Sequence, residues 1–378
     1  MRILHTADWH LGKTLKGQPL LDDQIFILDE IFNIIRDEKI DAVLISGDVY
    51  DRAIPPAEAV TLFDETLTKL AERKIPTLII AGNHDSATRL NFGRELFSRQ
   101  GIFINAKVDN EFKPVVLEDE FGEIYFTPIP FFEPGEIRAK FFGEDGDNLS
   151  YDAANKFFVA RAREKIPAGK RSVALAHVFL TGGVESESER KFVGGAANVN
   201  AETFAGYDYV ALGHLHRPQK ISAKNIRYAG SPLKYSFDEA NHKKSVTIVD
   251  FDAQGFVDTE KIPLKPRRDV RIVEGTLWEI LKTEPRTEDY ICARLLEREL
   301  NAFDKLSGRF PNLLNVEFCL RQNFSDDNST EETSHAGGTT LDYFAEFYSK
   351  QTGETLSAEY RMAMKDCLEQ LARDEREV

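Results

Sequence analysis

Five short clusters of Asp, Asn and His each follow directly on a run of apolar residues, and this pattern restricts the possible fold more than any other feature of the chain. The clusters are, in chain order, Asp8-Trp9-His10, Gly47-Asp48, Gly82-Asn83-His84-Asp85, His177 and Gly213-His214-Leu215-His216. Each apolar run has the length of a buried strand, and ligand sites of open α/β sheets gather at the carboxyl ends of strands. We therefore expect residues far apart in the sequence to meet at one edge.

Strand-like and helix-like patterns alternate from Met1 to about Ile262, which predicts an α/β fold with parallel strands covered on both faces. Strands are expected over 3–7, 41–46, 77–81, 172–177, 207–212, 220–228 and 245–252, a hairpin over 115–129, and helices over 22–38, 57–73 and 151–165. The helical spacing in 22–38 predicts one apolar face made of Ile25, Leu28, Ile31, Phe32 and Ile35. Together these elements suggest a β-sandwich with helices outside.

Composition predicts four segments. Prolines and a charge run at 263–268, expected to be solvated, mark a boundary between a large domain, 1–265, and a small α/β unit, 266–323. Residues 324–340 are polar and acidic, which predicts a flexible linker. Residues 341–378 are expected to form two amphipathic helices, which suit binding in a partner's groove or packing on their own domain.

The charge and the cysteines limit where the chain works. The net charge is -15, and residues 325–378 alone hold thirteen acidic and five basic residues, about half of the excess. We expect weak DNA affinity for the isolated chain and a partner that supplies more of the grip. The chain contains no stretch of eighteen apolar residues, so we expect no membrane span. Its N-terminus lacks the layout of a signal peptide. Three cysteines, far apart in sequence, favour a reducing cytoplasm.

The mixture of carboxylate, amide and imidazole groups suits manganese, iron or zinc better than calcium or magnesium. Two such ions roughly 3.5–4 Å apart can clamp the attacking and leaving oxygens of a displacement at phosphorus. Asp48 is the candidate bridge, because its two oxygens can face different ions. Asp8 and His10 can turn toward one ion, and Asn83 offers a neutral oxygen that limits negative charge near a phosphate.

Other polar residues around these clusters have less specific interpretations. We assign His84 to proton transfer on the scissile phosphate, with Asp85 orienting its ring. Arg89 is equally consistent with a phosphate contact and with a solvated helix face. His5, inside the first strand, is expected to be packed or hydrogen-bonded. Two sets have weak functional signals: His242 and His335, expected to be solvated, and Lys243-Lys244 and Arg267-Arg268, which are poor candidates for DNA contacts.

The ordered motifs DWH, GDVYD, GNHD, H and GHLH resemble those of the calcineurin-like metallophosphoesterase superfamily. The stretches MRILHTADWHLGKTL, GDVYDRAIPP, GNHDSATRL and YAGSPLKYSFDE are similar to the family of bacterial SbcD nuclease subunits. The resemblance implies a metallophosphoesterase β-sandwich flanked by helices, a small capping domain, and C-terminal helices that bind a partner. It also implies two manganese ions, one held by Asp8, His10, Asp48 and His216 and the other by Asp48, Asn83, His177 and His214, with His84 and Asp85 catalytic.

By the same resemblance the chain is expected to be an exonuclease and endonuclease on DNA ends and hairpins, in repair, recombination and replication. The implied assembly is a homodimer, joined through the first two helices, that works with an SbcC-like ABC-type ATPase carrying coiled coils, as a heterotetramer. Asp51 stands where archaeal and eukaryotic relatives have a second histidine, which leaves its role open. Two other functions stay open: a phosphoesterase for small molecules or phosphoproteins, and a scaffold that tethers an ATPase to DNA ends.

Overall fold

The computed structural model describes residues 1–143, 148–189 and 198–319 and part of 341–365. The chain forms two compact units, Met1–Arg321 and Gln322–Val378. In the second unit, helical backbone occurs at Leu341, at 344–345 and within 358–365, and the rings of Tyr348 and Tyr360 lie 6.4 Å apart. The predicted linker 324–340, with His335, and the predicted helical residues 366–378 lie outside the described residues. None of the described helices is long and apolar enough to cross a membrane.

Two six-stranded sheets pack face to face in the first unit, as expected for the β-sandwich. The first has the order β14 (Gly255–Pro263), β13 (Ser245–Asp252), β1 (Arg2–Thr6), β4 (Ala42–Ser46), β5 (Thr77–Ile80) and β6 (Ile102–Asn105). The second has the order β11 (Gln219–Lys220), β12 (Ile226–Tyr228), β10 (Tyr209–Gly213), β9 (Arg171–His177), β8 (Gly122–Ile129) and β7 (Val115–Asp119). In both sheets the central strands run parallel, so their carboxyl ends reach the same edge.

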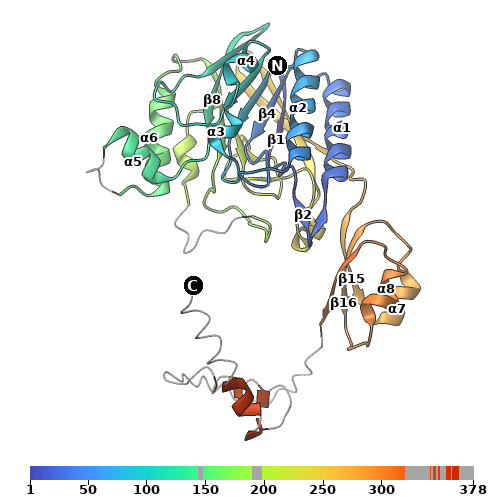
Figure 1. Cartoon of the computed structure of the whole chain (residues 1–378). Coiled ribbons are helices and arrows are strands. Elements are labelled where there is room, and N and C mark those ends of the chain that lie inside the picture. The colour runs from blue at the N-terminus through green and yellow to red at the C-terminus, as the bar shows by residue number, and fades with distance from the viewer. Residues whose placement is uncertain are drawn as a thin grey trace. The chain divides into compact units, whose positions relative to one another are not determined.

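Helices cover the outer faces of the sandwich (Figure 1). α1 (Leu21–Asp37) and α2 (Ala57–Glu72) pack on the first sheet, and α5 (Pro134–Phe141) and α6 (Tyr151–Arg163) lie on the second. A third apolar cluster fills the space between the sheets. The shorter elements are β2 (Thr14–Leu15), β3 (Gln18–Pro19), α3 (Ala87–Leu90), α4 (Arg94–Ser98), and the 3-10 helices η2 (Ala201–Phe204) and η3 (Phe237–Asn241).

Three details of the sequence prediction are wrong. Ile25 is 42% exposed, because the buried face of α1 is centred on Ile27, Leu28 and Ile31 instead. The strand expected over 220–228 is two short antiparallel strands, β11 and β12, separated by a turn. Strands β6 and β14 and helices α4 and α5 were not predicted, since their apolar patterns are short or one-sided.

A small three-stranded parallel sheet follows the sandwich, with β15 (Val270–Gly275), β16 (Tyr290–Leu295) and β17 (Leu313–Phe318). Helices α7 (Leu277–Thr283) and α8 (Ala302–Ser307) share its own apolar cluster. Asp23 of α1, which is buried, accepts both a bidentate ion pair from Arg268 and a hydrogen bond from Tyr290. The boundary segment 263–268 is therefore not wholly solvated, because its last residue is anchored to the sandwich.

The buried carboxylate of Asp119 joins the start of β9 to the end of β7. Its oxygens accept from the Arg171 guanidinium at 2.6 and 3.0 Å and from the Met1 ammonium at 3.0 Å, and both side chains of the Asp119–Arg171 pair are under a tenth exposed. We expect Asp119→Asn to lower the free energy of unfolding at pH 7 by about 3 kcal/mol, because a buried cation loses its partner. Urea denaturation measures this loss.

The pH dependence supplies a second readout for the same pair. The Arg171 hydrogen bonds hold the pKa of Asp119 well below its usual range. A depressed folded pKa means that the stability is present above the unfolded value, about 3.9, and is lost as the pH falls below it. The variant should therefore lose less stability than the wild type between pH 5 and pH 2, and equal losses in the two proteins would contradict the assignment.

Candidate metal centre

The predicted ligands all lie at the carboxyl ends of central strands from both sheets. Asp8 and His10 follow β1, and Asp48 follows β4. Asn83 lies in the turn after β5. His177 ends β9, and His214 and His216 follow β10. Except for Asn83, each of these side chains is buried. The structure thus brings together all seven residues of the predicted set, although their role as ligands stays a prediction.

An unusual backbone conformation aims several of these side chains. Asp8, His10, Asp48 and His214 have φ values of 54°, 45°, 49° and 105°, in the left-handed region that residues other than glycine rarely adopt. The loops are held there by main-chain bonds, from Asp8 N to Gly47 O and from His10 N to Asp48 O, both at 3.0 Å. A residue in such a conformation lowers the stability of the fold by about 1–3 kcal/mol, and residues of this kind cluster at functional sites.

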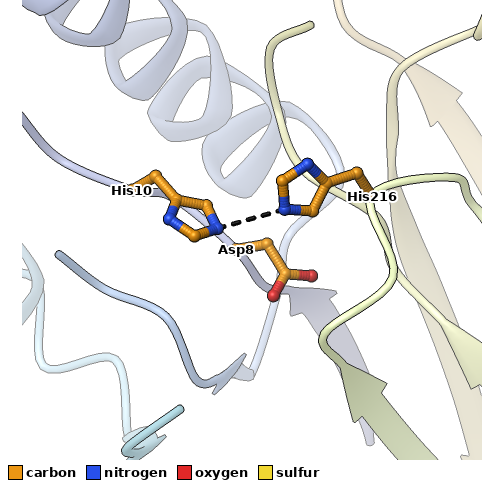
Figure 2. A group of neighbouring side chains, drawn as sticks. All are labelled: Asp8, His10 and His216. Atoms are coloured by element: carbon orange, nitrogen blue, oxygen red, sulfur yellow. Dashed lines mark hydrogen bonds between the residues drawn. The ribbon is translucent and has the colours of Figure 1, made fainter. Parts of the chain in front are cut away.

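Asp8, His10 and His216 form the first half of the centre (Figure 2). The Nε2 atoms of His10 and His216 face each other at 3.1 Å. Asp8 Oδ1 accepts from the His214 amide at 2.8 Å, whereas Asp8 Oδ2 is buried without a hydrogen-bond partner. A buried carboxylate oxygen without a partner is costly. A cation beside the two Nε2 atoms and Oδ2 would remove that cost.

Asn83, His177 and His214 form the second half. Asn83 Oδ1 lies 3.0 Å from both His177 Nε2 and His214 Nδ1. His177 Nδ1 lies 2.9 Å from the carbonyl of Ser46, which only accepts, so Nδ1 carries a proton and Nε2 is turned toward Asn83. These three atoms are of the kinds that divalent transition metals bind.

Asp48 lies between the two halves. Its Oδ2 is 3.3 Å from His177 Nε2 and 3.6 Å from His10 Nε2, and its Oδ1 accepts from the His84 amide at 2.9 Å. Among the described residues, carboxylate and imidazole atoms lie within 4.8 Å of one another in three overlapping groups: Asp8, His10 and His216; His10, Asp48 and His84; and Asp8, Asp48 and His177. The donor set and the partnerless oxygen of Asp8 therefore fit divalent metal ions.

Burial and the neighbouring charges set the protonation of these histidines. Burial lowers the pKa of His10 and of His214 to about 3, so both rings are neutral and offer lone pairs. Burial also disfavours a charged His177, but the charges of Asp48 and Asp8 outweigh it and raise the pKa of this histidine to about 9.

His84 and Asp85 do not interact as predicted. His84 Nδ1 is 2.8 Å from the main-chain carbonyl of Asp51, which orients the ring and leaves Nε2 free of that contact. The Asp85 carboxylate instead accepts from three main-chain amides, those of Val49, Tyr50 and Gly82, at 2.9–3.1 Å. Asp85 therefore ties the loop after β4 to the loop after β5, and the prediction that it orients the His84 ring is wrong.

Asp51 and Arg89 lie in the same region. The Asp51 carboxylate pairs with Lys13 at 2.7 Å and lies 3.6 Å from His10 Nδ1, so it faces the outer side of a predicted ligand. Arg89 is exposed, and its guanidinium donates to the carbonyl of Ala53 at 2.7 Å. This bond holds Arg89 against the loop after β4, while its predicted phosphate contact stays a prediction.

The sequence reasoning missed a buried polar layer behind His216. Glu239 of η3 and Ser188 both contact His216 Nδ1, at 3.2 and 2.7 Å, and Glu189 accepts from the His216 amide at 2.5 Å. Lys244 is buried and pairs with Glu239, so it is not available to DNA. The motif YAGSPLKYSFDE ends at Glu239, which is the one sequence signal that pointed to this layer.

Two further histidines are now placed. His5 is buried, with Nδ1 2.9 Å from the Tyr209 hydroxyl, and this confirms its expected structural role. His242 was expected to be solvated, but its side chain is only 14% exposed.

Comparison with known proteins identifies the class. A family model described as "Calcineurin-like phosphoesterase" matches residues 1–218. Two curated relatives, both named as the D subunit of the nuclease SbcCD, are 34% identical to the chain: that of Staphylococcus epidermidis over 86% of this chain and 88% of its own length, that of Staphylococcus saprophyticus over 94% and 95%. Among solved structures, TT1561 of Thermus thermophilus has a TM-score of 0.39 and 13% identity over 70% of this chain and 99% of that one.

The sandwich, the site at its edge and the family match define a phosphoesterase that uses divalent metal ions. Both curated relatives are matched over most of their length. The chain belongs to the calcineurin-like phosphoesterases and, within them, to the family of the SbcD nuclease subunits. The resemblance seen in the sequence is thereby confirmed, as is the expected fold.

Proposed function

We propose that the chain is a two-metal DNA nuclease that hydrolyses phosphodiester bonds at double-strand ends and hairpins. The observation that carries the proposal is the position of Asp48 Oδ2 between the two groups of histidines, 3.3 Å from His177 and 3.6 Å from His10. The printed name of the curated relatives, which calls them part of a nuclease, supports the substrate class. Roles in DNA repair, recombination and replication follow from that class.

Two divalent ions held here would activate a water molecule and neutralise the charge that develops on the scissile phosphate. Asp8, His10, Asp48 and His216 would hold one ion; Asp48, Asn83, His177 and His214 would hold the other. We propose manganese, because mixed imidazole and carboxylate ligands suit it better than magnesium.

His84 would act on the phosphate rather than on the metal. Its Nδ1 proton is held by the Asp51 carbonyl, so the ring would present Nε2 to the substrate, and the doubly protonated ring would donate its Nε2 proton to the leaving oxygen. Arg89, held by the Ala53 carbonyl, would contact a neighbouring phosphate. Since His84 also belongs to one of the groups that could hold an ion, its role must be separated from ligation by experiment.

We propose the assembly from the same relatives. Their name makes them one component of a two-part nuclease, so the partner of this chain would be an SbcC-like ABC-type ATPase with coiled coils. Residues 1–265 would form the nuclease domain, 266–323 a cap over DNA, 324–340 a linker and 341–378 the ATPase-binding helices. We also propose that the chain forms a homodimer within a heterotetramer and works in the cytoplasm. Among the described residues Cys292 and Cys319 are free thiols, which agrees with a reducing compartment.

Cleavage of an end-labelled hairpin DNA by the full chain, in manganese or magnesium and with or without the ATPase, tests this function. We expect His84→Gln to bind two ions as the wild type does but to cleave roughly 10²–10⁴-fold more slowly, because only proton transfer is lost. His335→Gln, in the predicted linker, is the matched control and should cleave normally.

Each other outcome has a distinct meaning. Loss of one ion in His84→Gln would make His84 a ligand. Unaltered cleavage by His84→Gln would show that the reaction does not need His84. Binding of the hairpin DNA without cleavage by the wild type in either metal would favour a tethering scaffold over a nuclease. Hydrolysis of a bis-nitrophenyl phosphate compound without any cleavage of DNA would favour an enzyme for small substrates.

A further inference from the structure

We propose that Glu239 and Lys244 are a positioning pair that holds His216 in the orientation and tautomer needed to bind a metal ion. The inference rests on the proposed metal site and extends it to residues outside the predicted ligand set. Neither residue belongs to a group of side chains, among those the structure describes, that could hold an ion, so each would act through His216.

The pair holds His216 at both ends. Glu239 is fully buried, and its Oε1 lies 3.2 Å from Nδ1 of the His216 ring. Lys244 is 6% exposed and donates to the main-chain carbonyl of His216 at 2.8 Å, to Ser231 Oγ at 2.7 Å and to Glu239 Oε2. With the ring and the main chain both fixed, little freedom remains for the side chain to turn away from His10.

The hydrogen bonds also fix where the imidazole proton lies. Ser188 Oγ lies within hydrogen-bond distance of Glu239 Oε1 and 2.7 Å from His216 Nδ1. A carboxylate only accepts, so the single hydroxyl proton of Ser188 goes to Glu239. Ser188 Oγ must then accept from His216, which places the ring proton on Nδ1. Nε2 keeps its lone pair, and this is the atom that faces His10 Nε2 at 3.1 Å.

Lys244 is needed because Glu239 is an anion without access to water. Lys244 donates to Glu239 Oε2, so the buried carboxylate has a cationic partner. A carboxylate behind a metal-bound imidazole is the usual carboxylate–histidine–metal arrangement, and its loss weakens metal binding about 10–100-fold.

The alternative is a buried ion pair that only stabilises the fold, and a double variant separates the two. Removing one partner of a buried pair leaves an unpaired charge, whereas replacing both by apolar residues of similar size restores stability. Glu239→Leu alone should lower both the unfolding temperature and the affinity for one of two manganese ions. In Glu239→Leu/Lys244→Met the unfolding temperature should recover toward the wild type, while the affinity for that ion stays about 10–100-fold weaker.

Titration calorimetry with manganese on the full chain, beside thermal unfolding of the metal-free chain, gives both readouts. Glu239→Gln keeps an acceptor for Nδ1 and should retain more affinity than Glu239→Leu. Asp119→Asn, which breaks the buried pair with Arg171 at the other end of β9, is the control that should lower the unfolding temperature without changing metal affinity.

Wild-type affinity for both ions in the double variant would overturn the inference. The inference would also fail if the metal affinity lost in Glu239→Leu returned in the double variant together with the unfolding temperature. If the wild type binds two ions but cleaves no DNA, the proposed function fails while this inference stands. If the wild type binds no metal ion, both fail.

Discussion

Asp48→Asn is expected to weaken the binding of both metal ions and to lower the rate of DNA cleavage on the order of 10³-fold. Removing one group that stabilises the charge of a transition state typically lowers a rate by about this factor. Asp48 Oδ2 faces His177 Nε2 and His10 Nε2 at 3.3 and 3.6 Å, so the same atom serves both halves of the centre. Asparagine keeps one oxygen but loses the charge, and its amide nitrogen cannot ligate a metal. Metal content after gel filtration and manganese calorimetry measure the loss.

Asp29→Asn is the matched control. The Asp29 carboxylate is 57% exposed and pairs with Lys69 at 2.9 Å between the outer helices α1 and α2. We expect this variant to keep both ions. Two ions bound by Asp48→Asn with unchanged affinity would show that Asp48 does not bridge them.

Gly213→Ala is expected to destabilise the chain by about 3 kcal/mol or more and to disturb the metal centre. The added methyl group would enter a fully packed interior, so neighbouring atoms would have to move. A Cβ at this position would lie 1.9 Å from the Ser46 carbonyl oxygen and 3.0 Å from His177 Nδ1. The first neighbour is main chain of the opposite sheet and cannot turn away. The two sheets would have to separate where their ligands meet.

Gly135→Ala tests whether the effect comes from space alone. Gly135 lies in α5, and nothing would lie within 4 Å of its Cβ, so this change should leave unfolding and metal binding near the wild type. Urea denaturation and manganese calorimetry on both variants make the comparison. Equal stability of the two variants would mean that the sheets can part at Gly213 without cost.

The predicted ligand set came from a local pattern. Asp8, His10 and Asp48 follow apolar runs, and such runs can be read from sequence because a buried strand needs consecutive apolar residues. That parallel strands bring their carboxyl ends to one edge is a general rule of such sheets, so the meeting of the clusters was predictable. The buried face of α1 was harder to predict from the sequence. Ile25 was assigned to it wrongly because two adjacent faces of the helix carry apolar residues.

Partners that lie far apart along the chain could not be predicted in this way. Asp85 stands next to His84 in sequence, yet it binds the amides of the neighbouring loop, because loop geometry decides where a carboxylate points. Lys244 looked like one of two surface lysines, and only the fold shows that it is buried against Glu239.

The sequence by itself therefore determined the fold class and the residues that gather at the edge of the sandwich, since both depend on short-range apolar patterns. The tertiary structure alone decided which atoms face one another: Asp48 between two groups of histidines, and Glu239 with Lys244 behind His216. The physical reason is that strand burial is set by neighbours in the chain, whereas hydrogen bonds and ion pairs depend on distances of a few ångströms between segments brought together only by folding.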